Sequence, residues 1–391
     1  MDDKNRVADE GTSNATATNI EQNNLPTANI VVAGKTGSGK STLLNAVFGV
    51  EFAATGKGRP ITAQIDEYAS ENVPIHIWDT VGLELDSAKT KESINSIRET
   101  IANKADSKDQ FDHIHAIWYC VNIGNNRYEG AELEFIKNLH AIGVPFIIVL
   151  TQCIGAEDDI NQFAQEIRQL NESMGMHNID IVPVCAKEFK LFGGITVPAY
   201  GLDKLVETTM KKMPDFIKGG FVAAQNVSKV QKREYCGDII EKYVDAALKG
   251  FWDKVPIVNF FTTDKKIPKM FSEIGKLYNS VIPESRIQEI IDYMGSMDLE
   301  HGVLGIILPV SKKFDSKVDA LFRQKQKEGF NVPIEKLEKS ERVARMLVYF
   351  GYLFLEAVEE IWEKRNETLL ADIDERVKYL KFLLSQKFQG K

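Results

Sequence analysis

The chain has 391 residues, of which 43% are hydrophobic and 27% are charged, and its formal net charge is −8. This length predicts two or three domains, each with a core of its own. The composition is typical of a soluble globular protein, and the negative charge argues against a general nucleic-acid binder. The longest apolar runs, at 303–310 and 346–355, are shorter than the roughly 20 residues that span a bilayer.

Residues 1–26 are rich in Asn, Thr, Ala and Glu and lack the apolar centre of a secretory signal. So few apolar side chains cannot offset the entropy of ordering, and we therefore predict a disordered tail. No Cys-x-x-Cys pair occurs, so we expect the cysteines to be small buried side chains in a reducing, cytoplasmic protein. They are Cys120, Cys153, Cys185 and Cys236.

Short apolar strands alternate with helical patterns from residue 28 to about residue 213. Strands are expected at 28–33, 64–69, 73–79, 113–121, 144–150 and 179–184. Helices are expected at 40–48, 90–103, 130–141, 158–173 and 202–213. This alternation predicts an α/β domain with a mostly parallel sheet flanked by helices. Ligands of such sheets bind beyond the carboxyl ends of the strands.

The strand pattern ends after residue 214. Apolar residues at helical spacing, such as Ile239, Ile240 and Val244, predict an all-α second half. Residues 341–388 have the pattern of one long amphipathic helix. The expected division is a tail at 1–26, an α/β domain at 27–214 and a helical domain at 215–391.

The octapeptide GKTGSGKS, at residues 34–41, joins the first expected strand to the first expected helix. It matches G-x-x-x-x-G-K-[ST], in which glycines let backbone N–H groups turn toward a phosphate. Lys40 can then reach the β- and γ-phosphates, and the Ser41 hydroxyl can ligate Mg²⁺. The motif predicts a nucleoside triphosphate site formed by Gly34, Lys35, Thr36, Gly37, Ser38, Gly39, Lys40, Ser41 and Thr42.

The segment WDTVG places Asp79 at the end of a strand and Gly82 three residues later. Asp79 can hold Mg²⁺ through water, and the Gly82 N–H can contact a γ-phosphate. Upstream, GKGRPITA has the glycines of a switch loop, in which Thr62 completes the Mg²⁺ shell and Thr55 is the competing position. We therefore predict Lys40, Thr62 and Gly82 as catalytic residues and Ser41, Thr62 and Asp79 as metal ligands.

The segment IVPVCAKE, at residues 181–188, ends the sixth expected strand. Its position along the chain predicts that the Ala186 N–H contacts O6 of a guanine. Cys185 precedes that contact, and Lys187 shapes the same loop. These residues are therefore also predicted to bind the nucleotide.

In this order, GKTGSGKSTLLNAVFG, GRPIT, WDTVGLE and VPVCAKE resemble the motifs of the Era-like GTPases of the translation-factor superclass. The similarity is greater to poorly characterised bacterial members, in which a helical domain of unknown function follows the G domain. It is good over residues 28–213, is thinner to about residue 300 and is absent beyond. It implies binding of GTP and GDP with Mg²⁺, hydrolysis of GTP to GDP and phosphate, and a nucleotide-driven switch coupled to the helical domain.

The resemblance places the base-reading loop at VLTQCIG, residues 149–155. Thr151 and Gln152 take the first two positions of the family's [NT]-K-x-D motif, but Ile154 stands where its Asp takes the guanine N1 and N2 hydrogens. An apolar side chain cannot accept those hydrogen bonds, so the choice between guanine and adenine stays open. The carboxylates at 157–159 either replace that Asp or stabilise a helix amino terminus.

The resemblance also predicts slow hydrolysis. Leu83 stands where many GTPases have a water-orienting Gln, which leaves that role to Glu84, a switch residue or a partner. Potassium-activated relatives have Asn at the position of Gly37. We expect self-association, as a homodimer, or an unidentified protein partner to accelerate turnover.

Two alternatives remain for the function as a whole. One is a slow-turnover scaffold resembling septins or immunity-associated GTPases, which assembles or touches a membrane peripherally through residues 255–261 or 302–310. The other is a P-loop NTPase with relaxed base choice, which Ile154 favours.

Overall fold

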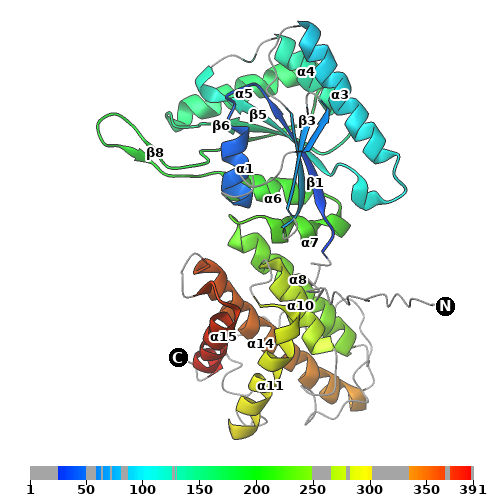
Figure 1. Ribbon diagram of the computed structural model, residues 1–391, viewed down its shortest axis with the longest axis vertical. Helices are drawn as coiled ribbons and strands as arrows, with labels where there is room; N and C mark the ends of the chain where they lie inside the picture. The colour runs from blue at the N-terminus through cyan, green and yellow to red at the C-terminus, as the bar shows by residue number, and fades with distance from the viewer. Residues whose placement is uncertain are drawn as a thin grey trace, which may run out of the picture.

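The computed structural model describes residues 25–49, 59–62, 65–70, 73–80, 87–125, 128, 130–248, 266–278, 282–301, 334–365 and 370–388. Within these ranges it shows an α/β part, residues 25–213, and a helical part, residues 214–388, stacked along the long axis of the molecule (Figure 1). No described helix is both long enough and apolar enough to cross a bilayer. The segments 255–261 and 302–310, considered above for membrane contact, lie outside the described residues.

The α/β part contains a seven-stranded sheet with the order β2-β3-β4-β1-β5-β6-β7 among the described residues. The pairs β1–β4, β1–β5, β5–β6 and β6–β7 are parallel, whereas β2–β3 and β3–β4 are antiparallel. The prediction of a mostly parallel sheet is therefore confirmed. The strands of this sheet are β1 (Ala28–Gly34), β2 (Arg59–Thr62), β3 (Ile65–Ser70), β4 (Val73–Thr80), β5 (Ala116–Asn122), β6 (Phe146–Thr151) and β7 (Asp180–Pro183).

Helices cover both faces of this sheet, because side chains along a strand point alternately to opposite faces. In β5, Trp118 and Cys120 face α1 and α6, whereas Ile117 and Tyr119 face α3, α4 and α5. Short 3₁₀ helices flank β5 at Gln110–Asp112 and Ile123–Asn125. The α-helices of this part are α1 (Lys40–Phe48), α3 (Ser87–Ala105), α4 (Gly130–His140), α5 (Glu157–Ser173) and α6 (Leu202–Lys212).

Two parts of the predicted element pattern need correction. The fourth predicted strand begins at Ala116 instead of residue 113, because His115 lies in the irregular segment before it, where its Nδ1 accepts the Asn29 N–H at 2.9 Å. The pattern also missed β2 and a small hairpin of β8 (Phe189–Lys190) and β9 (Thr196–Val197). Strands β2, β8 and β9 are short and lie next to glycines, and a pattern of this kind favours a turn over a strand.

The described residues of the second half are helical, as predicted. The prediction of one long helix over 341–388 is wrong, because two helices that pack on each other occupy this stretch. The Asp372 carboxylate accepts the N–H groups of Asp374 and Glu375, which starts a new helix inside the apolar pattern. The helices of this part are α7 (Asp215–Ala224), α8 (Lys229–Leu248), α10 (Lys266–Leu277), α11 (Glu284–His301), α14 (Ile334–Glu363) and α15 (Ile373–Phe388).

Helix α7 joins the two parts at the amino-terminal edge of the parallel strands. Gly220 lies so close to the chain before β1 that a Cβ there would be 1.7 Å from the Pro26 carbonyl oxygen. One hydrophobic cluster runs from the α1 and α6 face of the sheet through α7 into α8, α10 and α14. All four cysteines are free and buried, as expected.

The segment between α7 and α8 also binds the end of α1. The Asn226 N–H donates to the Val47 carbonyl at 2.7 Å, and its side-chain amide donates to the Phe48 carbonyl at 2.9 Å. The buried Gln225 side chain accepts the N–H groups of Val227 and Ser228, which holds this connection in one conformation. The two parts therefore share polar contacts as well as a core.

A buried lysine holds α7, α8 and α10 together. The Lys232 ammonium donates to the carbonyl oxygens of Val222 at 2.6 Å, Ala223 at 3.0 Å and Leu277 at 2.6 Å, and it lies 5.6 Å from the ring centre of Tyr278. The acceptors end α7 and α10, where the helix dipole favours a cation. Burial nevertheless lowers the pKa of Lys232 to about 7.

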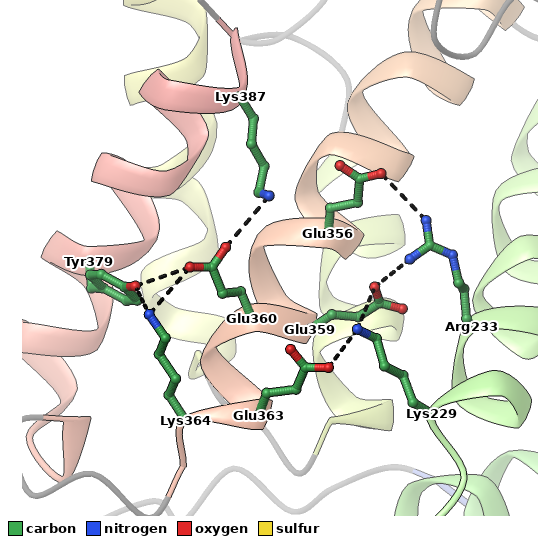
Figure 2. A network of polar contacts seen from close by, with 9 residues as sticks. All are labelled: Lys229, Arg233, Glu356, Glu359, Glu360, Glu363, Lys364, Tyr379 and Lys387. Carbon is green, nitrogen blue, oxygen red and sulfur yellow. Dashed lines mark hydrogen bonds and ion pairs between the residues drawn. The ribbon is translucent and has the colours of Figure 1, made fainter. Parts of the chain in front are cut away.

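Ion pairs surround α14 on two sides (Figure 2). Toward α8, Arg233 contacts the buried Glu359 at 2.5 Å and Lys229 contacts Glu363 at 2.6 Å. On the other side, Glu360 accepts the Tyr379 hydroxyl of α15 at 3.1 Å. These contacts fix how α14 is rotated between its two neighbours.

We predict that Lys232 makes the stability of the folded chain rise with pH. An unfolded lysine has a pKa of about 10.4, so between about pH 7 and that value the unfolded state binds more protons than the folded state. The free energy of unfolding then rises by up to about 1.4 kcal/mol per pH unit. Lys232→Met removes this rise, which denaturant titrations from about pH 7 to about pH 8.5 will measure.

The difference in unfolding free energy between wild type and Lys232→Met should therefore grow with pH in this window. Lys242→Met is the matched control, because Lys242 lies on the same helix with an exposed side chain paired to Glu273. Its difference from wild type should stay constant. A constant difference for Lys232→Met as well would contradict the prediction.

Candidate nucleotide-binding site

The loop of residues 34–41 leaves β1 at the carboxyl edge of the sheet and enters α1. Its Gly34, Gly37 and Gly39 have φ angles of 148°, 76° and 87°, which other residues rarely adopt. At Gly34 a Cβ would lie 2.5 Å from the Cys120 carbonyl oxygen. Gly39 begins α1 without a side-chain cap, so the first N–H groups of the helix remain available to an anion.

The Lys40 side chain folds back onto the carbonyl groups at the start of this loop. Its ammonium donates to the carbonyl oxygens of Gly34 at 2.9 Å and Lys35 at 3.3 Å. Ser41 and Thr42 follow in the first turn of α1 and are exposed. The loop therefore offers N–H groups, an ammonium and a hydroxyl at one place, which is the donor set that a polyphosphate and its cation require.

Asp79 lies beside this loop on β4, paired in register with Val32 of β1. Its Oδ1 is buried and has no hydrogen-bond partner within the described residues. Burial raises the pKa of Asp79 to about 6, and the nearby Lys40 charge opposes this shift. A carboxylate with a buried and unpaired oxygen fits a cation bound next to it.

The residues near Asp79 fit Mg²⁺ better than they fit a metal ion whose ligands all come from the protein. The described ranges contain no group of three or more His, Cys, Asp or Glu that could hold a metal ion. Mg²⁺ commonly uses one or two protein ligands and takes its other ligands from water and phosphate. Asp79 and Ser41 provide such a partial set.

Part of the predicted site lies outside the described residues. Gly82 lies outside the described residues, as do Thr55, Leu83 and Glu84. Thr62 is the last residue of β2 and pairs with Ile65, so this end of the predicted switch loop is strand; the Thr62 side chain is not described.

The loop after β6 contacts the phosphate loop directly. The Thr151 hydroxyl donates to the Ser38 carbonyl at 2.5 Å, and the Gln152 amide donates to the Gly37 carbonyl at 3.4 Å. Gln152 has a φ of 55°, an unusual angle for a residue other than glycine. Ile154 is half-buried two residues later. The predicted phosphate and base loops therefore lie side by side.

The loop after β7 joins the same edge. The Cys153 N–H donates to the Val184 carbonyl at 3.2 Å, which brings the predicted residues Cys185, Ala186 and Lys187 next to the loop after β6. The order of strands β1, β5, β6 and β7 explains this meeting, because their parallel carboxyl ends share one edge.

Sequence patterns missed a buried ion pair behind the phosphate loop. The Lys35 ammonium lies 2.6 Å from the carboxylate of Glu132 on α4, and the Tyr119 hydroxyl of β5 donates to the same carboxylate at 3.0 Å. Asn122 also donates its amide to the Gly37 carbonyl at 3.3 Å. No spacing rule points to Glu132, since an acid in the first turn of a helix is common and is usually exposed.

Residues 29–152 match the model of a family described as 50S ribosome-binding GTPase. This segment contains the phosphate loop, Asp79, the last residue of β6, Thr151, and the first residue of the loop after it, Gln152. Residues 29–152 are thus similar in sequence to a GTPase domain. No curated protein matches the chain.

The solved structures that are similar to the chain include the following three. The elongation factor SelB from Methanococcus maripaludis, in complex with the GTP analogue GPPNHP, has 18% identity over 49% of this chain and 35% of its own, with a TM-score of 0.32. A probable GTP-binding protein engB has 19% identity over 49% and 99%, with a TM-score of 0.31. Era from Aquifex aeolicus, bound to GDP and aluminium fluoride, has 18% identity over 49% and 58%, with a TM-score of 0.31. The chain thus spans about a third of the first of these proteins.

We predict that Glu132 positions the phosphate loop through Lys35. Glu132→Gln should lower the free energy of unfolding by about 2–3 kcal/mol, because it leaves the Lys35 charge without its buried partner while part of that side chain still reaches water. Replacing both residues by Met should cost less than the sum of the single changes, which a double-mutant cycle will measure. Glu134→Gln, at an exposed position on the same helix, is the control, and equal losses for the two Gln variants would contradict the prediction.

Proposed function

We propose that this chain binds GTP and GDP with Mg²⁺ and hydrolyses GTP. The observation that carries the proposal is the arrangement at the end of β1, where a loop with positive-φ glycines holds Lys40 near Asp79, whose Oδ1 is buried and unpaired. This arrangement lies in the segment that matches a GTPase family. We assign the nucleotide site to a domain of residues 27–214, followed by a helical domain of residues 215–391.

We assign a role to each residue that would contact the phosphates or Mg²⁺. Lys40 would exchange its contacts with the loop carbonyls for contacts with the β- and γ-phosphates. Ser41, Thr62 and Asp79 would hold Mg²⁺, which neutralises the phosphate charge when bound. The Gly82 N–H would contact the γ-phosphate. The amides of residues 34–42 would enclose the β-phosphate.

The base end uses the loops after β6 and β7. Gln152, held by its bond to Gly37, would cover one face of the base. Ala186 would donate its N–H to the base edge, and Cys185 and Lys187 would shape that loop. Thr151 would keep the base loop in register with the phosphate loop through its bond to Ser38.

The nucleotide would act on the helical domain through shared structure. Asn226 caps α1, and the hydrophobic core continues from the sheet into α8 and α14. Because of these contacts, we expect the nucleotide state to change the stability of the helical domain. A free rigid-body movement of that domain is not favoured. Nucleotide binding at the amino end of α1 would therefore change the stability of the Asn226 contacts at its carboxyl end.

Slow intrinsic turnover is part of this proposal. Leu83 stands at the position of the water-orienting Gln, and Gly37 has no side chain to ligate a potassium ion. We propose that a second copy of the chain or another protein supplies the missing group. Turnover per molecule would then rise with protein concentration or with that partner.

We predict that Lys40→Ala lowers the affinity for a fluorescent GTP analogue at least 100-fold, because it removes the charge that holds the β- and γ-phosphates. Fluorescence anisotropy measures the affinity, and phosphate release measures hydrolysis, which should fall to background. Lys211→Ala is the matched control, because it removes a lysine from the exposed face of α6. Equal affinity of wild type and Lys40→Ala would overturn the assignment of the phosphate site.

A further inference from the structure

The hairpin of β8 and β9 projects from the side of the α/β part (Figure 1). Its two strands form a sheet of their own and pair with no other strand in the described ranges. Gly193 and Gly194, with φ angles of 89° and 82°, lie in the turn at its tip. Residues 187–190 and 192–196 are exposed. The hairpin is therefore a surface feature that the main sheet does not support.

One face of this hairpin is apolar. Phe189 pairs with Val197 across the two strands, so their side chains share a face. Leu191, which donates its N–H to the Ile195 carbonyl at 2.8 Å, lies two residues further along and so adds to the same face. Phe189 is 41% exposed, Ile195 is 64% exposed, and Phe192 at the tip is fully exposed. A two-stranded hairpin of this kind is marginally stable in water, whereas three or more strands with an apolar face are stable, so the hairpin gains from added strands.

The base of the hairpin is fixed to the candidate nucleotide site. The Tyr200 main chain pairs with Cys185 of the loop after β7 through two hydrogen bonds of 2.9 and 3.1 Å. The Tyr200 hydroxyl donates to the carbonyl of Cys153, in the loop after β6, at 2.9 Å. A molecule that binds the hairpin therefore also restrains these two loops.

The open edges of the hairpin favour a protein strand over a lipid surface as its partner. Each strand of a two-stranded sheet has one edge whose N–H and C=O groups need hydrogen-bond partners, which hydrocarbon does not provide. Pro198 directly follows β9 and has no N–H, which makes that edge a poor template for pairing. The segment KEFK, residues 187–190, contains no proline, so the β8 edge can accept a strand from another molecule.

The β8 edge is complementary to itself in sequence. Glu188 and Lys190 flank Phe189, and both are exposed. When two such edges pair in antiparallel fashion with one Phe189 opposite the other, each Glu188 lies opposite a Lys190. This register joins two aromatic rings on the apolar face and forms two ion pairs on the opposite face. An interface in which the same patch meets itself is the kind that a two-fold axis creates.

We propose that the β8 edge pairs with the same edge of a second copy of the chain, which gives a dimer with a four-stranded sheet centred on Phe189. The contact is smaller than the roughly 800 Å² per partner of a standard interface, so the dimer dissociates readily. Pairing also restrains the loops after β6 and β7 through Tyr200. Its effect on GTP turnover rests on the proposed function, whereas the dimer itself does not.

Sedimentation velocity of the full chain, from about 1 to about 100 µM, tests the dimer. The wild type should form a reversible dimer in this range. Lys190→Glu and Glu188→Lys each place like charges opposite each other, so each variant alone should dimerise about tenfold more weakly or worse. An equal mixture of the two variants should dimerise like the wild type, because the charges of one copy then complement those of the other. Lys204→Glu, at an exposed position on α6, is the control and should leave the dimer unchanged.

GTP turnover at the same protein concentrations tests the link to the candidate site. Turnover per molecule should rise with concentration for the wild type and for the mixture of the two variants. It should stay constant for Lys190→Glu or Glu188→Lys alone. The affinity of each single variant for a fluorescent GTP analogue should equal that of the wild type, because neither side chain belongs to the proposed nucleotide site.

The outcomes separate this inference from the proposed function. A wild type that stays monomeric up to about 100 µM overturns the inference, and so does a dimer that both charge variants retain. Binding of the monomeric chain to vesicles of phosphatidylcholine and phosphatidylserine that is lost in Phe192→Ser also overturns it, since the hairpin then inserts into lipid. If the dimer responds to the variants as expected but the chain neither binds nor hydrolyses GTP, the proposed function fails and the dimer stands.

Discussion

Asn226 donates its backbone N–H to Val47 and its side-chain amide to Phe48, so the carboxyl end of α1 is capped by the segment that starts the helical part. The other end of α1 begins at Gly39 with no side-chain cap and faces the candidate phosphate site. The same helix is thus completed by protein at one end and open to an anion at the other. Its macrodipole favours negative charge at the open end.

The contacts around this helix make the two parts of the chain one packed body. Gly220 lets α7 approach the chain before β1, and Lys232 ties the ends of α7 and α10 to α8. The hydrophobic cluster crosses the same junction without a break. A ligand that stabilises the phosphate loop should therefore stabilise α8 and α14 as well, since ligand binding to a cooperative unit raises the stability of all of it.

The sequence predicted local features well and distant contacts poorly. The bounds of α1 were predicted to the residue, because a glycine loop between an apolar strand and an amphipathic stretch leaves few alternatives. The bonds of Asn226 to Phe48 and of Tyr200 to Cys153 join residues 178 and 47 positions apart, and no pattern along the chain encodes such partners. The pairing of Lys35 with Glu132 is of the same kind.

In the candidate site, too, some features were predicted from the sequence and others were not. The motifs and the resemblance that they carry assigned the loops after β1, β6 and β7 to one nucleotide site, and these loops lie together at one edge of the sheet. The roles of Thr62 and Gly82 stay predictions. The prediction of a single helix over 341–388 is wrong because the apolar periodicity continues across the start of α15. Only the cap at Asp372 marks the break between the two helices.

Hydrogen exchange with and without GTP and Mg²⁺ tests most directly whether the two parts form one thermodynamic unit. In wild type, the most protected amides of α8 and α14 should slow by the same factor as those of β1 and β5, since all of them then exchange through the same unfolding. Asn226→Ala should weaken this gain in α8 and α14 while the strands keep theirs. Protection by GTP that is confined to the α/β part in wild type would contradict the coupling of the two parts.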